Sequence, residues 1–401
     1  MRQFAWVLLG LTAGCASLQD DARVRRQAEG VVWGAMAAPS SELRVEATRI
    51  VADVSDPLLD RGLGARLGDP SPSVRATAAA ALVRQTPLAT EALNRIFDGN
   101  DADAKVIAID AIGALDGGKE RLAALAADRD LRVRARVATA VAQWKPENAR
   151  ALLDKLLHDE DAGVRGQALA GLARLGDRGA LGEITEALED RSLGVRLAAL
   201  GALVRVGRDA VGNQLLALAS GPQATPASGD RYVALRAAVQ LSRVGYAGVA
   251  LPALRAAADD ADPALRAAAM NAAGELGREG NALALAHLGD PDVDVRLAAA
   301  RAVAATGRHD QALAVLVNAL ATPRRLDAAD DLARLGDPRG LEVLEAAARA
   351  SDAHERRVAL ALLAPLPAGR DSLIAALADA DAGVRLDAAG ALLRRLLRYD
   401  R

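Results

Sequence analysis

The chain has few aromatic side chains and no excess of charge of either sign. Two Phe, three Trp and three Tyr make up 2% of its 401 residues, and 50 Lys and Arg stand against 52 Asp and Glu, a net charge of -2. A surface that stacks the bases of single-stranded nucleic acid needs several aromatic rings, and a DNA-wrapping face needs excess positive charge. We therefore expect no nucleic-acid partner.

The side chains that most metal sites and many enzymes use are also scarce. With one cysteine, the chain cannot form an internal disulfide or a cysteine-based zinc or iron–sulfur site. Its four histidines are scattered outside any His-Glu-x-x-His motif, and no glycine-rich segment continues into the Gly-Lys-Ser/Thr sequence of a phosphate-binding loop. We therefore predict no enzymatic activity, no metal and no cofactor.

The single cysteine, Cys15, ends a short apolar segment at the start of the chain. Arg2 supplies a positive charge, an apolar run covers residues 4–11, and small residues stand directly before Cys15. The run is far shorter than the ~20 residues of a membrane-spanning helix, and the pattern is typical of a secretory signal. Residues 1–14 resemble a bacterial lipoprotein signal peptide, which implies that Cys15 is lipidated and becomes the N-terminus. The alternative is an ordinary signal peptide with an incidental cysteine.

A lipidated Cys15 predicts where the protein resides. Residues 15–30 are mostly polar and form a tether, so the lipid is the expected contact with the membrane. The residue after the cysteine is Ala16 and not Asp. For a bacterial lipoprotein this implies export to the outer membrane, facing the periplasm.

The rest of the chain repeats one pattern. An acidic or Pro-containing turn leads to an aliphatic residue, a mostly Arg "anchor" residue and an Ala- and Leu-rich segment. Successive anchors are 29 to 32 residues apart, except for one spacing of 38, which gives twelve copies. The anchors are Arg44, Arg75, Lys105, Arg134, Arg165, Arg196, Ala234, Arg266, Arg296, Arg325, Arg356 and Arg385.

The spacing of apolar residues within a copy predicts a helix. They fall at positions −1, +3, +4, +7 and +10 from the anchor, as in Val164, Ala168, Leu169, Leu172 and Leu175. A second helix precedes each anchor helix, so the unit is a helical hairpin that buries its apolar stripe only by stacking on its neighbours. We predict an all-α fold, an α-solenoid of about twelve such hairpins of ~30 residues.

Residues 31–401 resemble HEAT repeats, specifically the short PBS-lyase HEAT-like variety. A Gly-, Pro- and Ser-rich insertion at residues 219–230 accounts for the spacing of 38 and separates the repeats of residues 31–218 from those of residues 231–401. The insertion is either a tolerated loop or hinge, or a contact for a partner. We also expect the basic last helix to form the polar cap of the array end.

The Asp and Arg residues of the turns have a structural interpretation. Aspartates just ahead of a helix cap its free amides, and an arginine in the first turn can reach the acidic turn of an adjacent unit. The resemblance to HEAT-like repeats implies that such residues form a ladder between units. The predicted ladder residues are Arg75, Arg134, Arg165, Arg196, Arg266, Arg296, Arg385, Asp130, Asp161, Asp262 and Asp292.

We interpret the chain as a lipid-anchored envelope scaffold or adaptor that binds proteins along its anchor helices. Arginines recur nine residues after the anchor, where they either line a groove for an acidic partner or only stabilise the helix C-termini. The predicted partner-binding residues are Gln167, Arg174, Arg205, Arg236 and Arg243. The alternatives are an enzyme or chaperone of the bilin-lyase type, which the family resemblance suggests, and a purely structural envelope component.

Overall fold

The computed structural model describes six stretches of the chain, residues 20–54, 57–115, 117–207, 228–243, 247–307 and 309–397. The predicted signal peptide, Cys15 and most of the predicted insertion therefore lie outside the described residues. Every regular element within these stretches is a helix, which confirms the predicted all-α solenoid class. Among them, no helix is both long enough and apolar enough to cross a membrane.

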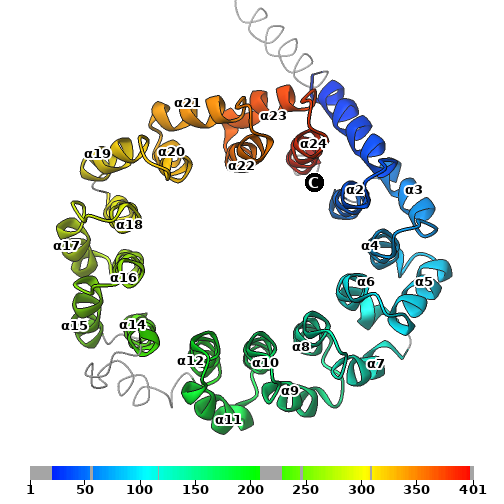
Figure 1. Ribbon diagram of the computed structural model, residues 1–401, viewed down its shortest axis with the longest axis horizontal. Helices are drawn as coiled ribbons and strands as arrows, with labels where there is room; N and C mark the ends of the chain where they lie inside the picture. Colours follow the sequence, from blue (N-terminus) through cyan, green and yellow to red (C-terminus); the bar gives the residue numbers. More distant parts are fainter. Residues whose placement is uncertain are drawn as a thin grey trace, which may run out of the picture. The chain divides into compact units, whose positions relative to one another are not determined.

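The chain divides into two compact units. Unit 1 combines residues 1–111 with residues 336–401, and unit 2 is the continuous segment 112–335. This division does not coincide with the predicted boundary at residues 219–230. In each unit, helices that contain an anchor residue, here called anchor helices, alternate along the chain with the helices that precede them, here called backing helices (Figure 1).

Unit 1 begins with a helix over residues 20–36, whose Val24 and Ala28 side chains are fully buried. The prediction that residues 15–30 form a polar tether is therefore wrong from residue 20 onward, because this stretch packs into the repeat stack. The anchor helices of unit 1 are α2 (Ser41–Val54), α4 (Pro72–Leu82), α6 (Ala102–Ala108), α22 (Ala353–Leu363) and α24 (Ala382–Leu397). Its other elements are α3 (Pro57–Arg66), α5 (Pro87–Asp98), α21 (Pro338–Ala347), η4 (Pro367–Gly369) and α23 (Arg370–Ala376), while η1 (Ile109–Ala114) spans the boundary with unit 2.

Unit 2 repeats the same arrangement. Its anchor helices are α8 (Leu131–Trp144), α10 (Ala162–Leu175), α12 (Leu193–Gly207), α14 (Ser228–Arg243), α16 (Pro263–Glu275), α18 (Val293–Ala304) and α20 (Arg325–Arg334). Its other elements are α7 (Gly118–Leu125), α9 (Ala149–Leu157), η2 (Arg178–Ala180), α11 (Leu181–Glu186), η3 (Ala187–Glu189), α15 (Ala247–Ala258), α17 (Arg278–Ala286) and α19 (His309–Ala319).

Helix α10 illustrates why each copy folds as it does. The Asp161 carboxylate caps its start by accepting a hydrogen bond from the Val164 amide, and Gly176 ends it with a φ of 69°, which glycine adopts at low cost. Val164, Ala168, Leu169 and Leu172 are fully buried, as predicted, whereas Leu175 is only partly buried. The anchor helix therefore faces the core with the predicted stripe, which is one turn shorter than expected.

Small residues let neighbouring repeats approach closely. A methyl group added at Gly171 of α10 would lie 2.7 Å from Leu153 of α9 and 3.1 Å from the Ala138 carbonyl of α8. Because such close contacts leave no room for a larger side chain, the Ala- and Gly-rich composition is a packing requirement of the stacked hairpins.

Within unit 1, the last helix packs against the first anchor helix. Gly390 of α24 lies against Ile50 of α2, where a methyl group on Gly390 would come within 2.8 Å of the Ile50 side chain. Arg370 of α23 binds the carboxylates of Asp20 and Asp21 at 3.0 and 2.6 Å. The prediction that the last helix is a polar end cap is therefore wrong, because α24 stacks on α2 as one repeat stacks on the next.

Candidate functional site

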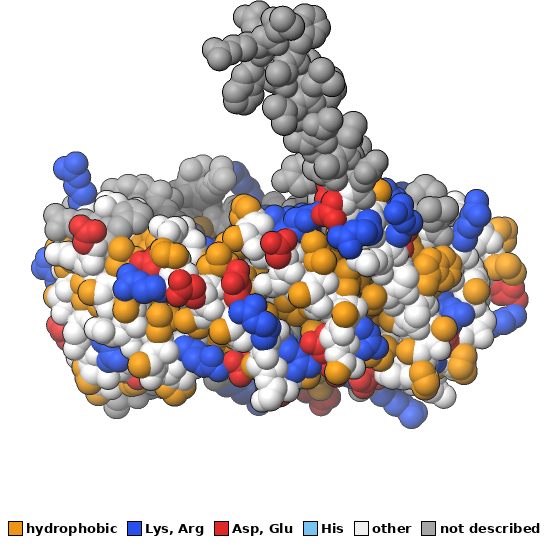
Figure 2. Space-filling view, turned by 90° about the horizontal axis from the view of Figure 1, so that it is seen from above, with side chains coloured by type: hydrophobic (Ala, Val, Ile, Leu, Met, Phe, Trp, Pro, Cys, Tyr) orange, Lys and Arg blue, Asp and Glu red, His pale blue; other side chains and the backbone are white. Residues whose placement is uncertain are grey.

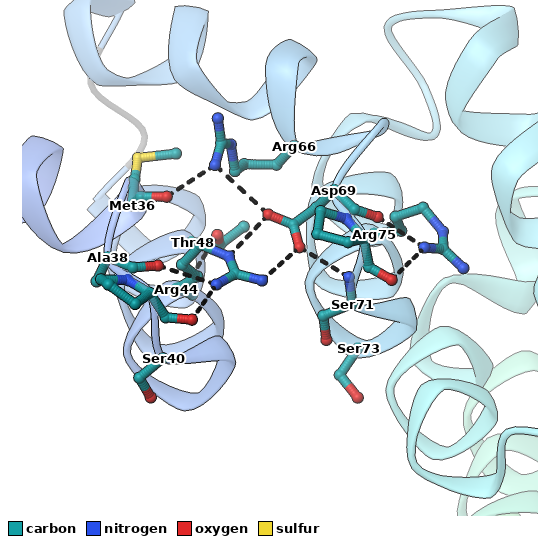
Figure 3. Close-up of polar contacts among 12 residues, drawn as sticks. Met36, Ala38, Ser40, Arg44, Thr48, Arg66, Asp69, Ser71, Ser73 and Arg75 are labelled. Carbon is teal, nitrogen blue, oxygen red and sulfur yellow. Dashed lines mark hydrogen bonds and ion pairs between the residues drawn. The ribbon is translucent and has the colours of Figure 1, made fainter.

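The anchor arginines connect successive repeats through a recurring contact that we call the Asp–Arg joint. Arg165 donates from Nη1 to the Asp159 and Glu160 carbonyls of its own turn, at 2.9 and 3.0 Å. Its Nε and Nη2 bind both oxygens of the Asp190 carboxylate in the following repeat, at 2.8 and 2.9 Å. Such a planar two-point contact holds the two turns in one register. Figure 3 shows the same joint between Arg44 and Asp69.

The joints follow one spacing rule. The carboxylate that receives an anchor arginine stands six residues before the next anchor. The joints with two-point contacts are Arg44–Asp69, Arg134–Asp159, Arg165–Asp190, Arg266–Asp290 and Arg356–Asp379. In the repeat whose anchor is Ala234, Arg231 forms an ion pair with Asp260 and so replaces the missing arginine.

The predicted ladder is corrected at its aspartates. Asp130, Asp161, Asp262 and Asp292 each accept a backbone amide hydrogen bond and cap the helix that follows them. The two-point partner of the arginine is instead the residue two places earlier, such as Asp159 or Asp290. The reason is geometric, because a side chain at the cap position is turned back onto its own helix.

The predicted ladder arginines fall into two groups. Arg134, Arg165 and Arg266 form joints, whereas Arg75, Arg196, Arg296 and Arg385 bond to the carbonyls of their own turns. For the first three of this second group, the position six residues before the next anchor holds Gly99, Ser228 and Ala319, and no anchor follows Arg385. The spacing rule can be applied to the sequence alone once the register is known.

The joints hold their carboxylates in the charged form. The hydrogen bonds from Arg165 to Asp190, from Arg266 to Asp290 and from Arg356 to Asp379 lower the pKa of these carboxyls below the ordinary value. For Asp159, burial raises the pKa, but hydrogen bonds from Arg134 and from the Asp161 amide outweigh it, so the pKa is lowered as well. Fixed, paired charges of this kind serve structure and are unsuited to proton transfer.

The predicted partner-binding residues lie on consecutive anchor helices of unit 2. Gln167 and Arg174 of α10, Arg205 of α12 and Arg236 of α14 have exposed side chains. Arg243 lies in α14, but its side chain is outside the described set. The Thr139 hydroxyl of α8 donates a hydrogen bond of 3.3 Å to the Gln167 side chain, so this surface is continuous from α8 to α10.

Charge is distributed unequally around these helices. Helices α8, α10 and α12 contain no Asp or Glu, whereas the backing helices α9 and α11 contain Asp154, Glu183 and Glu186. Arg174 and Arg205 form no ion pair within the described part of unit 2. By contrast, the face seen in Figure 2, which looks onto α21 and α23 of unit 1, has basic and acidic side chains interspersed.

The described residues hold no cluster of three or more His, Cys, Asp or Glu side chains that could bind a metal ion. Of the four histidines, His158 and His287 have described side-chain contacts with backbone carbonyls.

Comparison with protein-family models agrees with the repeat assignment for residues 118–226. A family model described as HEAT repeats matches residues 118–182 and 149–226. No match to a curated protein sequence is found.

Solved structures similar to this chain include an engineered protein, with 20% identity, a TM-score of 0.30, and 93% of this chain and 99% of that one covered. The complex of CpcE and CpcF of phycocyanin lyase from Nostoc sp. PCC7120 has 19% identity, a TM-score of 0.33, and coverage of 62% and 94%. Kap121p has 11% identity and a TM-score of 0.41, and the match covers 88% of this chain but only 47% of Kap121p. The chain is an all-α solenoid, and its residues 118–226 match the family model of HEAT repeats.

Proposed function

We propose that this protein is a lipid-anchored scaffold that binds an acidic segment of a protein partner on the anchor helices of unit 2. The observation that carries the proposal is the composition of α8, α10 and α12, which lack acidic residues and expose Gln167, Arg174 and Arg205. An acidic segment that lies along these helices gains ion pairs with Arg174 and Arg205, and the helices contribute no like charge, which favours both encounter and correct register.

The anchor in this proposal is Cys15, at the end of the lipoprotein-like segment. Several acyl chains on one cysteine give effectively permanent attachment, because each buried methylene contributes about 0.8 kcal/mol. The scaffold then faces the periplasm from the outer membrane and acts by binding, without catalysis.

A charge-reversal experiment tests the binding surface. Arg174→Glu/Arg205→Glu changes two exposed anchor-helix arginines, and Arg178→Glu/Arg255→Glu makes the same change in net charge on η2 and α15. Crosslinking in cells, followed by affinity capture and mass spectrometry, is expected to recover a discrete partner with the wild type and with the second variant. The first variant is expected to lose it. Equal recovery with both variants contradicts the proposed surface.

The lipid anchor needs a separate test. Cys15→Ala is expected to abolish metabolic labelling with a fatty acid and to release the protein from the membrane fraction. Labelling or membrane attachment that persists in Cys15→Ala contradicts the proposed lipid anchor at Cys15. The proposed binding surface of unit 2 is then judged by the charge-reversal result alone.

A further inference from the structure

A pocket of about 470 Å³ lies in unit 1 where the turn before α4 faces α5 and the turn before α6. Arg75 of α4 and Gly99, at the end of α5, both line it. Other lining residues are Asp69, Pro70, Arg95 and Asn100.

The same groove recurs between the last two repeats of unit 1. There a pocket of about 350 Å³ is lined by Arg356 and Asp379, which form a complete joint. Arg75 and Arg356 are anchors, and Gly99 and Asp379 both stand six residues before the next anchor. The larger pocket is thus the one in which the joint lacks its carboxylate.

Arg75 is oriented like an arginine in a complete joint. Its Nη1 donates to the Asp69 and Pro70 carbonyls at 2.6 and 3.0 Å, the contacts that fix every joint arginine on its own turn (Figure 3). Its Nε and Nη2 have no partner among the described residues, although in Arg356 these two atoms bind Asp379. A preoriented guanidinium with two unused donors is a receptor for a carboxylate.

The neighbouring charges permit an anion at this position. Asp69 is already bound by Arg44, and Arg95 pairs with Glu91. Asp101 stands two residues after Gly99 and caps α6. The complete Arg356–Asp379 joint also has a capping aspartate beside it, because Asp381 stands two residues after Asp379 and accepts a hydrogen bond from the Val384 amide. A carboxylate is thus tolerated beside a capping aspartate.

We propose that the Arg75 pocket binds the carboxylate of an external ligand, which completes the vacant joint. The shared chemistry is a single carboxylate, supplied either by an acidic side chain of a protein or by a free small acid. Nothing in this site depends on the surface of unit 2 proposed above.

Arginine modification by phenylglyoxal, mapped by mass spectrometry on the full chain, tests the proposal. Without ligand, Arg75 is expected to react about tenfold faster than Arg356, whose guanidinium is held by Asp379. Acetyl-aspartate amide is expected to slow the reaction of Arg75 and not that of Arg356. Acetyl-asparagine amide, which has the same shape without the charge, should protect neither arginine.

A capped peptide with one internal aspartate distinguishes the two sources of the carboxylate. Protection by the peptide as well as by acetyl-aspartate amide assigns the site to acidic protein segments. Protection by the amino-acid derivative alone assigns it to small acids. Both results support the proposal, whereas an unchanged rate for Arg75, or equal protection by the asparagine compound, overturns it.

Two reciprocal substitutions are expected to close the binding site at Arg75 and to create one at Arg356. Gly99 has extended backbone angles, φ −84° and ψ −174°, so Gly99→Asp is compatible with its conformation, and a Cβ there would lie 3.3 Å from the Arg95 carbonyl. Gly99→Asp is expected to slow Arg75 modification and to abolish ligand protection, while Gly99→Asn retains protection. Asp379→Gly is expected to transfer the protectable reactivity to Arg356.

Circular dichroism confirms that each variant is folded before its rates are compared. If Gly99→Asp is folded but Arg75 keeps its wild-type rate and its protection, the vacant joint is not the binding site and the proposal fails. The wild-type protection experiment decides the question even if that variant does not fold.

Discussion

At the scale of single residues, the role of an arginine depends on its position in the repeat. Only 8% of the Arg165 side chain and 15% of the Asp190 side chain are exposed. Stacking of the repeats removes both charges from water, and each residue neutralises the charge of the other. Arg174, nine residues after the Arg165 anchor, is exposed and lies outside any joint. Loss of a joint residue should therefore affect stability, and loss of an exposed arginine should affect binding.

Arg165→Ala is expected to lower the free energy of unfolding by about 3 kcal/mol, because it leaves the Asp190 carboxylate without its partner. Arg174→Ala, the exposed control on the same helix, is expected to change it by less than about 0.5 kcal/mol. Urea unfolding followed by circular dichroism measures both. Similar losses for the two variants would argue against a structural role specific to the joints.

The Arg165–Asp190 joint also predicts a pH dependence. Because Arg165 lowers the pKa of Asp190, the pair stabilises the fold above the unfolded pKa of about 3.9 and loses this effect as pH falls through the folded value. Asp190→Asn is expected to be less stable than wild type by about 2 kcal/mol at pH 7. This gap should narrow between pH 4 and pH 3 in urea titrations. A gap that stays constant down to pH 3 would mean that Asp190 does not act through its charge.

At the scale of helices, the sequence predicts much of the fold. Apolar spacing around Val164 and Leu169 identifies the buried stripe, and Gly176 marks the end of α10. The sequence does not show which of the two aspartates in a turn binds the arginine of the preceding repeat, since Asp159 and Asp161 are chemically identical. Backbone geometry decides this, because the cap position turns its side chain toward the amides of its own helix.

The two aspartates should differ in the cost of their removal. Asp161→Ala is expected to lower the free energy of unfolding by about 1 kcal/mol, the usual cost of losing a helix cap, and Asp161→Asn by much less because asparagine also caps. Asp159→Asn, in contrast, removes the charge that receives Arg134 and should be destabilising. Urea unfolding of these three variants compares the roles, and a harmful Asp161→Asn beside a harmless Asp159→Asn would reverse the assignment.

At the scale of the whole molecule, the candidate site was only partly predictable. Exposed positions such as Gln167 and Arg205 follow from helical periodicity, because they lie off the buried stripe. The packing of α24 on α2 did not follow, since a repeat pattern specifies how neighbours stack and contains no signal for contact between the first and the last copy.

Cysteines at the α2–α24 contact test this packing. In a Cys15→Ala background, the pair Ile50→Cys/Gly390→Cys is expected to form an internal disulfide under mild oxidation, since the two residues are in contact. Ile50→Cys/Gly383→Cys is the control, because Gly383 lies seven residues away on the same helix, about 10 Å along its axis. Gel mobility without reductant separates the products. Equal crosslinking of both pairs would contradict the packing of α24 on α2.

Site-specific photocrosslinking tests most directly whether a protein partner binds the anchor helices of unit 2. A photoreactive amino acid replaces Gln167 on α10 or, in a matched variant, the exposed Glu186 on the backing helix α11. We predict one discrete crosslinked protein from position 167 in cells and none from position 186. The reverse pattern, or the same products from both positions, would contradict the account.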